Sequence, residues 1–434
     1  MAYKAFEDKT LGFSTRQLHA GYDPSEHHLA KAVPIYQSAA FEIGSYERSI
    51  RLFSYQEEGT SYVRFSNPTT TVLERRVASL EGGTAAIAMG SGMAAISSAL
   101  LNLASPGDNI VASRTIYGGS DTFFKKLLPR YGVNVTFVAN EDDPESFEAA
   151  LSENTKAIFI ETIGNPLCNI IDIERVAKIA HAHNIPLVVD NTFATPYLLR
   201  PFEYGADIVC YSATKYLNGH GNSIAGICVE KGDFDWLGNG KYPYMETFYE
   251  EHKNTIGEET LGRELFTKKM RIEYLTELGA HISPQTSFYL MQGIETLSLR
   301  MDRHVRNALE VAKFLEGHAA VKEVSYPGLP SSKYFELAKK YFPGGRAGAI
   351  MSLRMNGGLE AAKRVLDRVR LFDYMVNVGD AKSMIVHPAT STNFGQLKEV
   401  SEAAGVYEDT LRLSIGCEDA EDLIADLEQA LKQS

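Results

Sequence analysis

The decisive stretch of this chain is Ala206-Asp207-Ile208-Val209-Cys210-Tyr211, which leads directly into Ser212-Ala213-Thr214-Lys215-Tyr216. The first six residues are strongly apolar and predict a buried strand. A glycine-rich polar stretch at 218–222 follows and predicts a turn. Lys215 is therefore expected where a core strand ends. In open α/β sheets, ligands bind at the carboxyl ends of strands.

A lysine among apolar neighbours loses hydration, which disfavours its ammonium form and leaves the amine as a nucleophile. Such an amine condenses with an aldehyde to form a Schiff base, so we take an aldehyde cofactor as the hypothesis. Ser212 and Thr214 flank Lys215 with hydroxyl groups that can bind an anion. By itself, the pattern also fits an exposed lysine after a strand, with serine and threonine as ordinary turn formers.

Length and composition describe an ordinary globular protein. The 434 residues suggest about two or three domains. The hydrophobic share is 44%, the charged share is 23% and the net charge is −12, which argues against nucleic acid or anionic membranes as main partners. No apolar run approaches the roughly 20 residues of a membrane span. The four cysteines lack metal-type spacing, so we expect a cytoplasmic protein without a metal site.

Two composition changes divide the chain. Residues 1–70 hold few periodic segments and many aromatics, and we expect an arm that lies on another surface, such as a second subunit. From Thr71, apolar strands alternate with amphipathic helices, which predicts an α/β fold with a mostly parallel sheet covered on both faces. The expected strands are residues 84–89, 109–112, 133–138, 156–161, 185–190, 206–211 and 223–230.

The large domain is expected over residues 71–298. An insertion at about 231–276 breaks the alternation, with some helix around 260–278. A smaller C-terminal α/β domain is expected over 299–434, because helical and strand-like segments alternate again there.

Three more signals follow predicted strands. Gly90-Ser91-Gly92-Met93 joins a strand to a helix whose free N–H groups suit a phosphate, or it is a serine cap with turn glycines. Asp190 ends the strand unit before the one leading to Lys215, and its carboxylate can keep a pyridine nitrogen protonated, cap a helix or pair with a base. Tyr117 can stack on a flat ring or lie on the surface. Together the four signals describe a phosphorylated pyridine aldehyde, which is pyridoxal phosphate.

The stretch from Asp207 to His220 resembles the signature of the fold-type I pyridoxal-phosphate enzymes of cysteine and methionine metabolism, and the resemblance covers essentially the whole chain. It implies that Lys215 carries the cofactor and removes a substrate proton. It also implies that Asp190 faces the pyridine nitrogen. Tyr117 is implied to stack on the ring and to move protons.

The resemblance implies three further groups of residues. The phosphate would be held by Gly92, Met93, Ser212 and Thr214, and by Tyr62 and Arg64 of a neighbouring subunit. Asn165 and Thr192 would lie near the other edge of the ring. The substrate would be bound by Asn165, Ser383 and Arg412. A planar guanidinium such as that of Arg412 suits the α-carboxylate. Without the resemblance, Arg412 would be interpreted as an arginine at a strand edge that forms a surface ion pair.

Within the family, the likeness is closest to O-acetylhomoserine sulfhydrylases. It is carried by Ser38-Ala39-Ala40-Phe41, by the insertion after Lys231 and by Asp380-Ala381-Lys382-Ser383 before His387-Pro388-Ala389. The implied reaction converts O-acetyl-L-homoserine and sulfide or methanethiol to homocysteine or methionine, with release of acetate. The implied assembly is a homotetramer of dimers that share active sites.

Several alternatives stay open at this point. A cystathionine γ-synthase, a γ-lyase or an O-succinylhomoserine sulfhydrylase would use the same residues. Methionine γ-lyases typically carry a cysteine where this chain has Gly119. The chain also departs from the subgroup at Tyr211 and at Asn393, where a histidine is common, and neither position is expected to touch the cofactor. A non-catalytic nucleotide-binding α/β protein is the rival outside the family.

Overall fold

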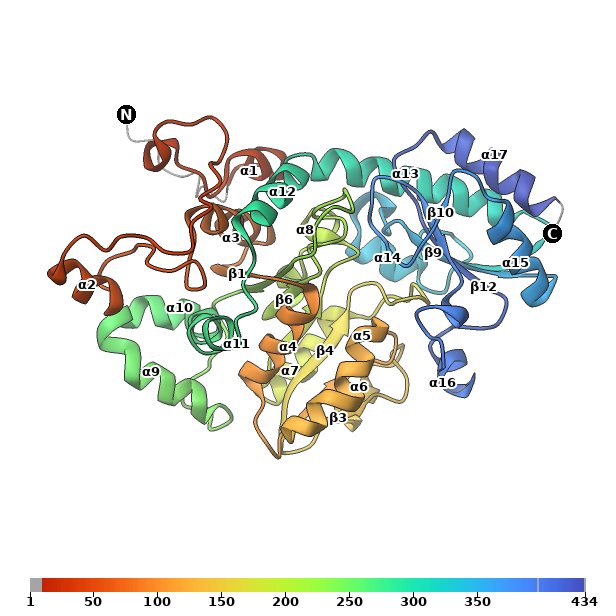
Figure 1. Ribbon diagram of the computed structural model, residues 1–434. Coiled ribbons are helices and arrows are strands. Elements are labelled where there is room, and N and C mark those ends of the chain that lie inside the picture. The colour runs from red at the N-terminus through yellow and green to blue at the C-terminus, as the bar shows by residue number, and fades with distance from the viewer. Residues whose placement is uncertain (1–9, 396–397, 433–434) are drawn as a thin grey trace.

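A computed structural model describes residues 10–395 and 398–432 (Figure 1). Residues 1–9 of the expected arm and the last two residues of the expected C-terminal domain lie outside the described residues. The larger sheet has the strand order β1-β7-β6-β5-β4-β2-β3. Its strands are β1 (Ala85–Met89), β2 (Asn109–Ala112), β3 (Asn134–Phe137), β4 (Thr155–Glu161), β5 (Leu187–Asp190), β6 (Ile208–Tyr211) and β7 (Gly226–Glu230).

Every neighbouring pair in this sheet is parallel except the two that involve β7. The predicted mostly parallel sheet is thus confirmed, and each of the seven predicted strands is present with ends shifted by a few residues at most. The antiparallel β7 lies between β6 and the edge strand β1, so the chain returns next to β6 after the turn that contains Lys215.

Side chains alternate between the two faces of the sheet, as the two-residue period of a strand requires. On β4, Ile158 and Ile160 belong to one hydrophobic cluster, whereas Ala157 and Phe159 belong to a second. The first cluster includes residues of α3 (Pro68–Glu81) and α7 (Ile173–Ala182), among other helices, and the second includes residues of α4 (Gly92–Leu103). Helices therefore cover both faces of the sheet.

The second sheet lies beyond these layers and has the order β10-β11-β12-β9-β8. Its strands are β8 (Val321–Ser325), β9 (Ile350–Met355), β10 (Asp373–Tyr374), β11 (Met384–Val386) and β12 (Thr410–Ser414). The alternation of apolar residues did not reveal β8 and β10, because β8 carries exposed polar side chains and β10 is very short.

A long helix, α13 (Leu297–Glu316), runs along the top of Figure 1 from the larger sheet towards the second one. Its buried residues share one hydrophobic cluster with strands of both sheets. The domain boundary near residue 299 stays a prediction. The other principal helices of this half are α12 (Pro284–Glu295), α14 (Phe335–Tyr341), α15 (Gly358–Arg368), α16 (Lys398–Ala403) and α17 (Ala420–Leu431).

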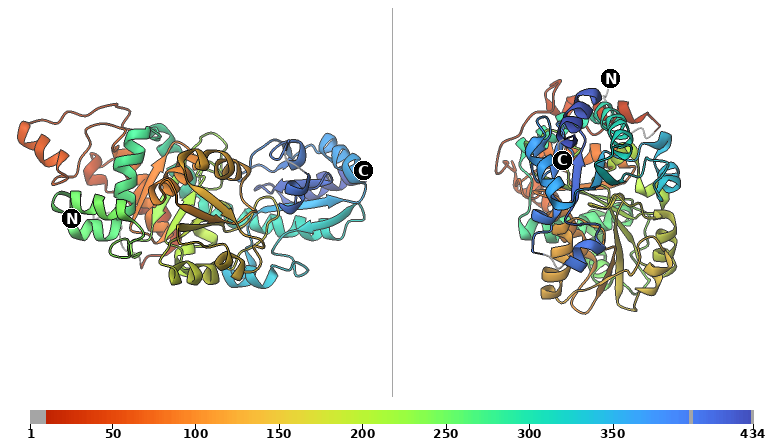
Figure 2. Two further views of the ribbon diagram at one scale, coloured as in Figure 1. Left: turned by 90° about the horizontal axis from the view of Figure 1, so that it is seen from below. Right: turned by 90° about the vertical axis from the view of Figure 1, so that its right-hand side faces the viewer.

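The N-terminal segment has two parts. Helix α1 (Phe13–His19) packs on α3, α12 and α13, and Gln17 Nε2 donates a hydrogen bond of 2.9 Å to Ser298 Oγ. Helix α2 (Tyr46–Phe53) instead projects from one end of the molecule, close to the insertion, whereas the second sheet lies at the other end (Figure 2). Tyr46, Ile50 and Phe53 are exposed on α2, so this part of the segment leaves apolar side chains uncovered.

The insertion is more helical than its sequence suggests. It contains α9 (Pro243–Ile256), α10 (Glu258–Lys269), a π-helical turn (Met270–Leu275) and α11 (Thr276–Leu278). The expectation of helix only around 260–278 missed α9, whose tyrosines and phenylalanines have low intrinsic helix propensity. Met245 and Phe248 are buried on α9, and this packing overrides the propensity.

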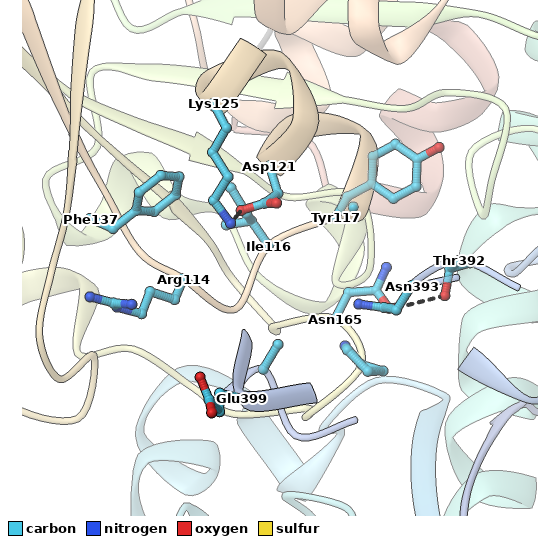
Figure 3. A pocket seen from close by; sticks show the side chains of 13 residues that line it. Arg114, Ile116, Tyr117, Asp121, Lys125, Phe137, Asn165, Thr392, Asn393 and Glu399 are labelled. Atoms are coloured by element: carbon cyan, nitrogen blue, oxygen red, sulfur yellow. Dashed lines mark hydrogen bonds and ion pairs between the residues drawn. The ribbon is translucent and has the colours of Figure 1, made fainter. Parts of the chain in front are cut away.

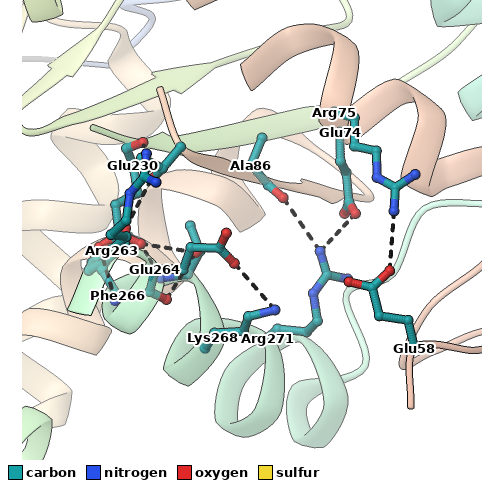
Figure 4. Close-up of polar contacts among 12 residues, drawn as sticks. Glu58, Glu74, Arg75, Ala86, Glu230, Arg263, Glu264, Phe266, Lys268 and Arg271 are labelled. Carbon is teal, nitrogen blue, oxygen red and sulfur yellow. Dashed lines mark hydrogen bonds and ion pairs between the residues drawn. The ribbon is translucent and has the colours of Figure 1, made fainter. Parts of the chain in front are cut away.

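The insertion is held to the sheet by two buried carboxylates (Figure 4). Glu230, at the end of β7, accepts hydrogen bonds from Trp236 Nε1 and from the backbone N–H groups of Phe266 and Thr267, at 3.3, 3.2 and 2.8 Å. On α3, Glu74 pairs with Arg271 of the insertion at 2.8 Å. The Glu230 side chain therefore fixes both the start of the insertion, at Trp236, and its second helix, α10.

Among the helices of the described residues, none combines the length and the apolar character needed to cross a membrane. Those residues also hold no group of three or more histidine, cysteine, aspartate or glutamate side chains suited to a metal ion. The short helices of the large-sheet half are α5 (Gly118–Thr122), α6 (Glu145–Ala149) and α8 (Thr195–Leu198).

We predict that Glu230→Ala destabilises the protein by about 3 kcal/mol, because several buried donors lose their acceptor at once. Trp236 is the only tryptophan of the chain, so its fluorescence during urea unfolding reports this region directly. Glu264→Ala is the matched control, since it removes only the partly exposed ion pair with Lys268 and should cost less than about 1 kcal/mol. Equal losses in the two variants would contradict the anchoring role of Glu230.

Candidate active site

The site is built at the carboxyl ends of three parallel neighbours, β4, β5 and β6. Glu161, the last residue of β4, is in register with Asp190, and Asp190 is in register with Cys210. Lys215 lies in the turn that follows β6. The strand ends therefore meet at one edge of the sheet, as the sequence predicts for Asp190 and Lys215.

Lys215 is half-buried, and its Nζ donates a hydrogen bond of 2.5 Å to Asn377 Oδ1. Burial, together with the smaller effect of the nearby Arg412 guanidinium, lowers the pKa of Lys215 to about 8. At pH 7 about one tenth of such an amine is uncharged. Lys215 can thus act as a nucleophile and as a base near neutral pH.

Asp190 is buried, and its Oδ1 accepts hydrogen bonds from the backbone N–H and the hydroxyl of Thr192, at 2.9 and 2.5 Å. Burial raises the pKa of Asp190 to about 6, and the two hydrogen bonds from Thr192 oppose that rise. The carboxylate is mainly ionised at neutral pH. A buried anion of this kind suits a protonated nitrogen.

A cup for an anion lies at the N-terminus of α4. Ser91 caps the helix by accepting a hydrogen bond from the Ala94 N–H at 3.1 Å. Within the described chain, the N–H groups of Gly92 and Met93 have no hydrogen-bond partner. A helix N-terminus with free N–H groups favours phosphate.

The cup is closed by the turn before Lys215. A Cβ on Gly92 would lie 2.7 Å from the Ser212 Cβ, so only glycine allows this close approach. The Thr214 hydroxyl donates to the Ala225 carbonyl at 3.2 Å and accepts from the Ala225 N–H at 3.0 Å. Thr214 therefore holds the turn before Lys215 against the residue that precedes β7.

Arg412, on β12, reaches the site from the second sheet. Its Nη1 donates to Asn165 Oδ1 at 3.0 Å and its Nη2 to the Asn377 carbonyl at 3.3 Å. It is buried, and burial lowers its pKa to about 10. No carboxylate of the described residues pairs with this guanidinium. A buried cation without a counter-ion is costly, which makes a carboxylate ligand favourable here.

A cavity of about 380 Å³ is lined in part by Tyr117, Asn165 and Asn393 (Figure 3). Asn165 connects it to Arg412, whereas Lys215 and Asp190 are not among the lining residues. The Tyr117 side chain is 46% exposed, so its ring is available for stacking. Asn393, expected to lie away from the cofactor core, thus shares a cavity wall with two predicted site residues.

Gly119 determines where the Tyr117 ring lies. A Cβ at position 119 would be 2.3 Å from Tyr117 Cε1. A cysteine at this position would have to displace the ring. The glycine is therefore part of the geometry of the site.

The structure does not bring every predicted residue together. Arg64 donates to the Thr276 carbonyl and stacks on Tyr62 at 5.5 Å from the ring centroid. Within the described residues, neither side chain contacts Lys215 or the cup. Ser383 donates to Glu418 Oε2 at 2.9 Å and accepts from the Gly416 N–H at 2.8 Å, so its hydroxyl is engaged away from Lys215. The roles of these three residues stay predictions.

Sequence reasoning missed two polar residues of the site. Asn377 lies between β10 and β11 and contacts both Lys215 and Arg412. Glu161 ends a strand next to Asp190, which is the same signal that identified Asp190. Asn377 gave no comparable signal, because it belongs to a loop far from Lys215 in the chain.

The comparisons with known proteins agree with this geometry. A family model described as Cys/Met metabolism PLP-dependent enzyme matches residues 14–432. The chain belongs to this family. Enzymes of this family depend on pyridoxal phosphate. This chain shares the fold-type I architecture of the family's solved structures.

Three relatives illustrate the family. The homocysteine synthase of Schizosaccharomyces pombe is 44% identical over 97% of this chain and 98% of its own length. The L-methionine gamma-lyase of Treponema denticola is 41% identical over 98% of each chain. The structure of an O-acetylhomoserine (thiol)-lyase from Campylobacter jejuni has a TM-score of 0.92 at 39% identity, covers 97% of this chain and all of its own, and contains N'-pyridoxyl-lysine-5'-monophosphate.

The residues present fit pyridoxal phosphate. At the cup, the lack of a side chain on Gly92 lets the start of α4 approach Ser212, so backbone N–H groups and a hydroxyl converge where a phosphate would be held. Asp190 offers a buried anion for the pyridine nitrogen, and Lys215 offers an amine with a lowered pKa for the aldehyde. The donor set therefore matches each polar end of the cofactor.

The lowered pKa of Lys215 predicts a pH profile for cofactor uptake. Only the neutral amine reacts with the aldehyde, so the rate at which the cofactor-free protein takes up pyridoxal phosphate should rise with pH and level off just above pH 8. An ordinary lysine, with a pKa of about 10.4, would keep gaining rate to pH 10 and beyond. Stopped-flow absorbance measures the profile.

Lys215→Ala is the control, and borohydride should fix no pyridoxyl group on the peptide that contains position 215. A profile that climbs past pH 10, or a pyridoxyl group found on another lysine of the wild-type protein, would overturn the assignment of Lys215.

Proposed function

We propose that this protein is an O-acetylhomoserine sulfhydrylase. In the reaction, the Cγ–O bond of O-acetyl-L-homoserine breaks and acetate leaves, while sulfide or methanethiol forms the new Cγ–S bond. The products are homocysteine or methionine. The proposal rests on one observation above all: beside Lys215 lies the Arg412 guanidinium, which no carboxylate of the described residues neutralises. Together the two residues provide a carboxylate site and a base for one amino-acid substrate.

Each residue has a task in this reaction. Arg412 binds the α-carboxylate in a bidentate manner and orients Cα, while Asn165 and Asn377 hold the guanidinium in place. Lys215 removes the Cα proton and returns it later. Bound pyridoxal phosphate supplies an electron sink for the negative charge that forms at Cα.

Two other residues support the proton transfers. Asp190 keeps its negative charge opposite the pyridine nitrogen, because Thr192 hydrogen-bonds the ionised form. Tyr117 lies at the cavity wall, where its hydroxyl can carry protons near Cβ and Cγ. Gly92, Met93, Ser212 and Thr214 would hold the phosphate.

A γ-lyase is the second candidate, because a gamma-lyase is among the relatives of similar identity. The geometry at position 119 favours the sulfhydrylase: methionine γ-lyases typically carry a cysteine after the Tyr-Gly pair, and that side chain would collide with the Tyr117 ring as it lies here. The protein must also select between acetyl and succinyl leaving groups, and between sulfide, methanethiol and cysteine as the nucleophile. Both choices concern the same active site.

Product analysis tests the function. With O-acetyl-L-homoserine and sulfide, we expect homocysteine and acetate in equal amounts. Omitting sulfide should lower acetate release by about tenfold or more, because no nucleophile completes the reaction. O-succinyl-L-homoserine, methanethiol and cysteine are then compared by kcat/KM. If 2-oxobutyrate and ammonia dominate even with sulfide present, the protein is a γ-lyase.

We also propose that the protein acts as a homotetramer of dimers, in which Tyr62 and Arg64 complete the phosphate site of the neighbouring subunit. In support, α2 projects from one end of the molecule with Tyr46, Ile50 and Phe53 exposed, and Arg64 donates to the carbonyl of Thr276, a residue of α11. A cytoplasmic location stays a prediction.

Complementation tests the shared site. Arg64→Ala and Lys215→Ala should each be nearly inactive, whereas co-expressed mixed dimers should regain activity, because one of their two sites carries neither substitution. With one intact site per mixed dimer, activity should approach half that of the wild-type dimer. Arg48→Ala in place of Arg64→Ala is the control, since Arg48 pairs with Glu57 within the same segment. If verified mixed dimers are no more active than the parents, Arg64 acts within its own chain.

A further inference from the structure

Glu161 is a carboxyl group of the site to which neither sequence nor family assigned a role. It is the last residue of β4, with 6% of its surface exposed, and it lies in register with Asp190 on β5. Its Oε1 accepts a hydrogen bond of 2.6 Å from the backbone N–H of Tyr117. On one side, Glu161 thus contacts Tyr117, which borders the cavity. On the other side it neighbours Asp190, the carboxylate assigned to the pyridine nitrogen.

Two buried carboxyl groups side by side rarely both ionise, because each negative charge disfavours the other. Asp190 has the stronger support, since Thr192 donates two hydrogen bonds to it, and burial raises its pKa only to about 6. Burial and the Asp190 charge raise the pKa of Glu161 well above its usual range, and only the Tyr117 N–H opposes them. The charge therefore resides on Asp190.

We propose that Glu161 is a positioning residue that remains a neutral carboxyl group and holds the Tyr117 backbone in place. Two effects follow. Tyr117 is the residue before helix α5 (Gly118–Thr122), and the Glu161 carboxyl accepts its backbone N–H and so holds it at the start of that helix. The site also keeps a single negative charge, on Asp190, to face the single positive charge of a protonated pyridine nitrogen. This inference rests on the roles proposed above for Tyr117 and Asp190.

The test compares Glu161→Gln with Glu161→Ala in the cofactor-loaded enzyme. Glutamine keeps an acceptor for the Tyr117 N–H and cannot ionise, so it should behave as the wild type. Alanine leaves the N–H without its acceptor, and the rate of cofactor loss should rise by about 10- to 100-fold. Visible circular dichroism should change in the alanine variant alone, because it reports how the cofactor ring is held.

A pH titration of the visible absorbance separates a neutral from an ionised Glu161. If Glu161 is neutral, Glu161→Gln leaves the titration midpoint unchanged. If Glu161 is an anion, its removal lowers the midpoint, because a negative charge favours the protonated chromophore. Rescue by glutamine together with an unchanged midpoint is the expected result.

Glu230→Gln is the matched control, because Glu230 is also a buried carboxyl group that accepts backbone N–H groups, but at the insertion. It should leave the visible circular dichroism unchanged. A glutamine variant as impaired as the alanine variant, or an alanine variant that holds its cofactor as the wild type does, would overturn the proposal. All readouts concern the cofactor, so they stand even if product analysis shows another substrate.

Discussion

The structure depends on the parallel pairing of β4, β5 and β6. This register brings the residues after three apolar strands to one edge of the sheet, although the three strands are separated in the chain by helices. The cost is that ionisable groups are buried there, where a charge without a partner is unfavourable. Each group has its own compensation: Thr192 for Asp190, Asn377 for Lys215, and Asn165 for Arg412.

The sequence predicts this edge well, because continuous apolar runs mark buried parallel strands and the polar residue after each run must face the edge. Asp190, Lys215 and the turn before α4 follow from that rule. Asn377 does not, since its contact with Lys215 spans 162 positions and joins two sheets. Nor does α9, which is stabilised by its packing on α10 and by the burial of Met245 and Phe248 in the second hydrophobic cluster, and not by helix propensity.

The roles predicted for Ser383 and Arg64 stay predictions for a different reason. Ser383 and Arg64 already have partners within the chain, Glu418 and the Thr276 carbonyl respectively. A motif identifies the type of residue at a position. The group that its side chain binds depends also on which subunit or ligand lies beside it. The part of the site that one chain alone builds is thus the strand edge, the α4 cup and Arg412.

Tyr211 extends the same charge arrangement beneath the strand edge. It stands where a histidine is common in the subgroup, and it is fully buried. Its hydroxyl donates to Glu81 and accepts from Asn191 Nδ2 at 3.0 Å. Burial raises the pKa of both Glu81 and Tyr211 well above their usual ranges. A histidine at this position can take up a proton and pair with Glu81, whereas the phenol of Tyr211 brings no positive charge to the layer beside Asp190 and leaves Asp190 to meet a cationic ring.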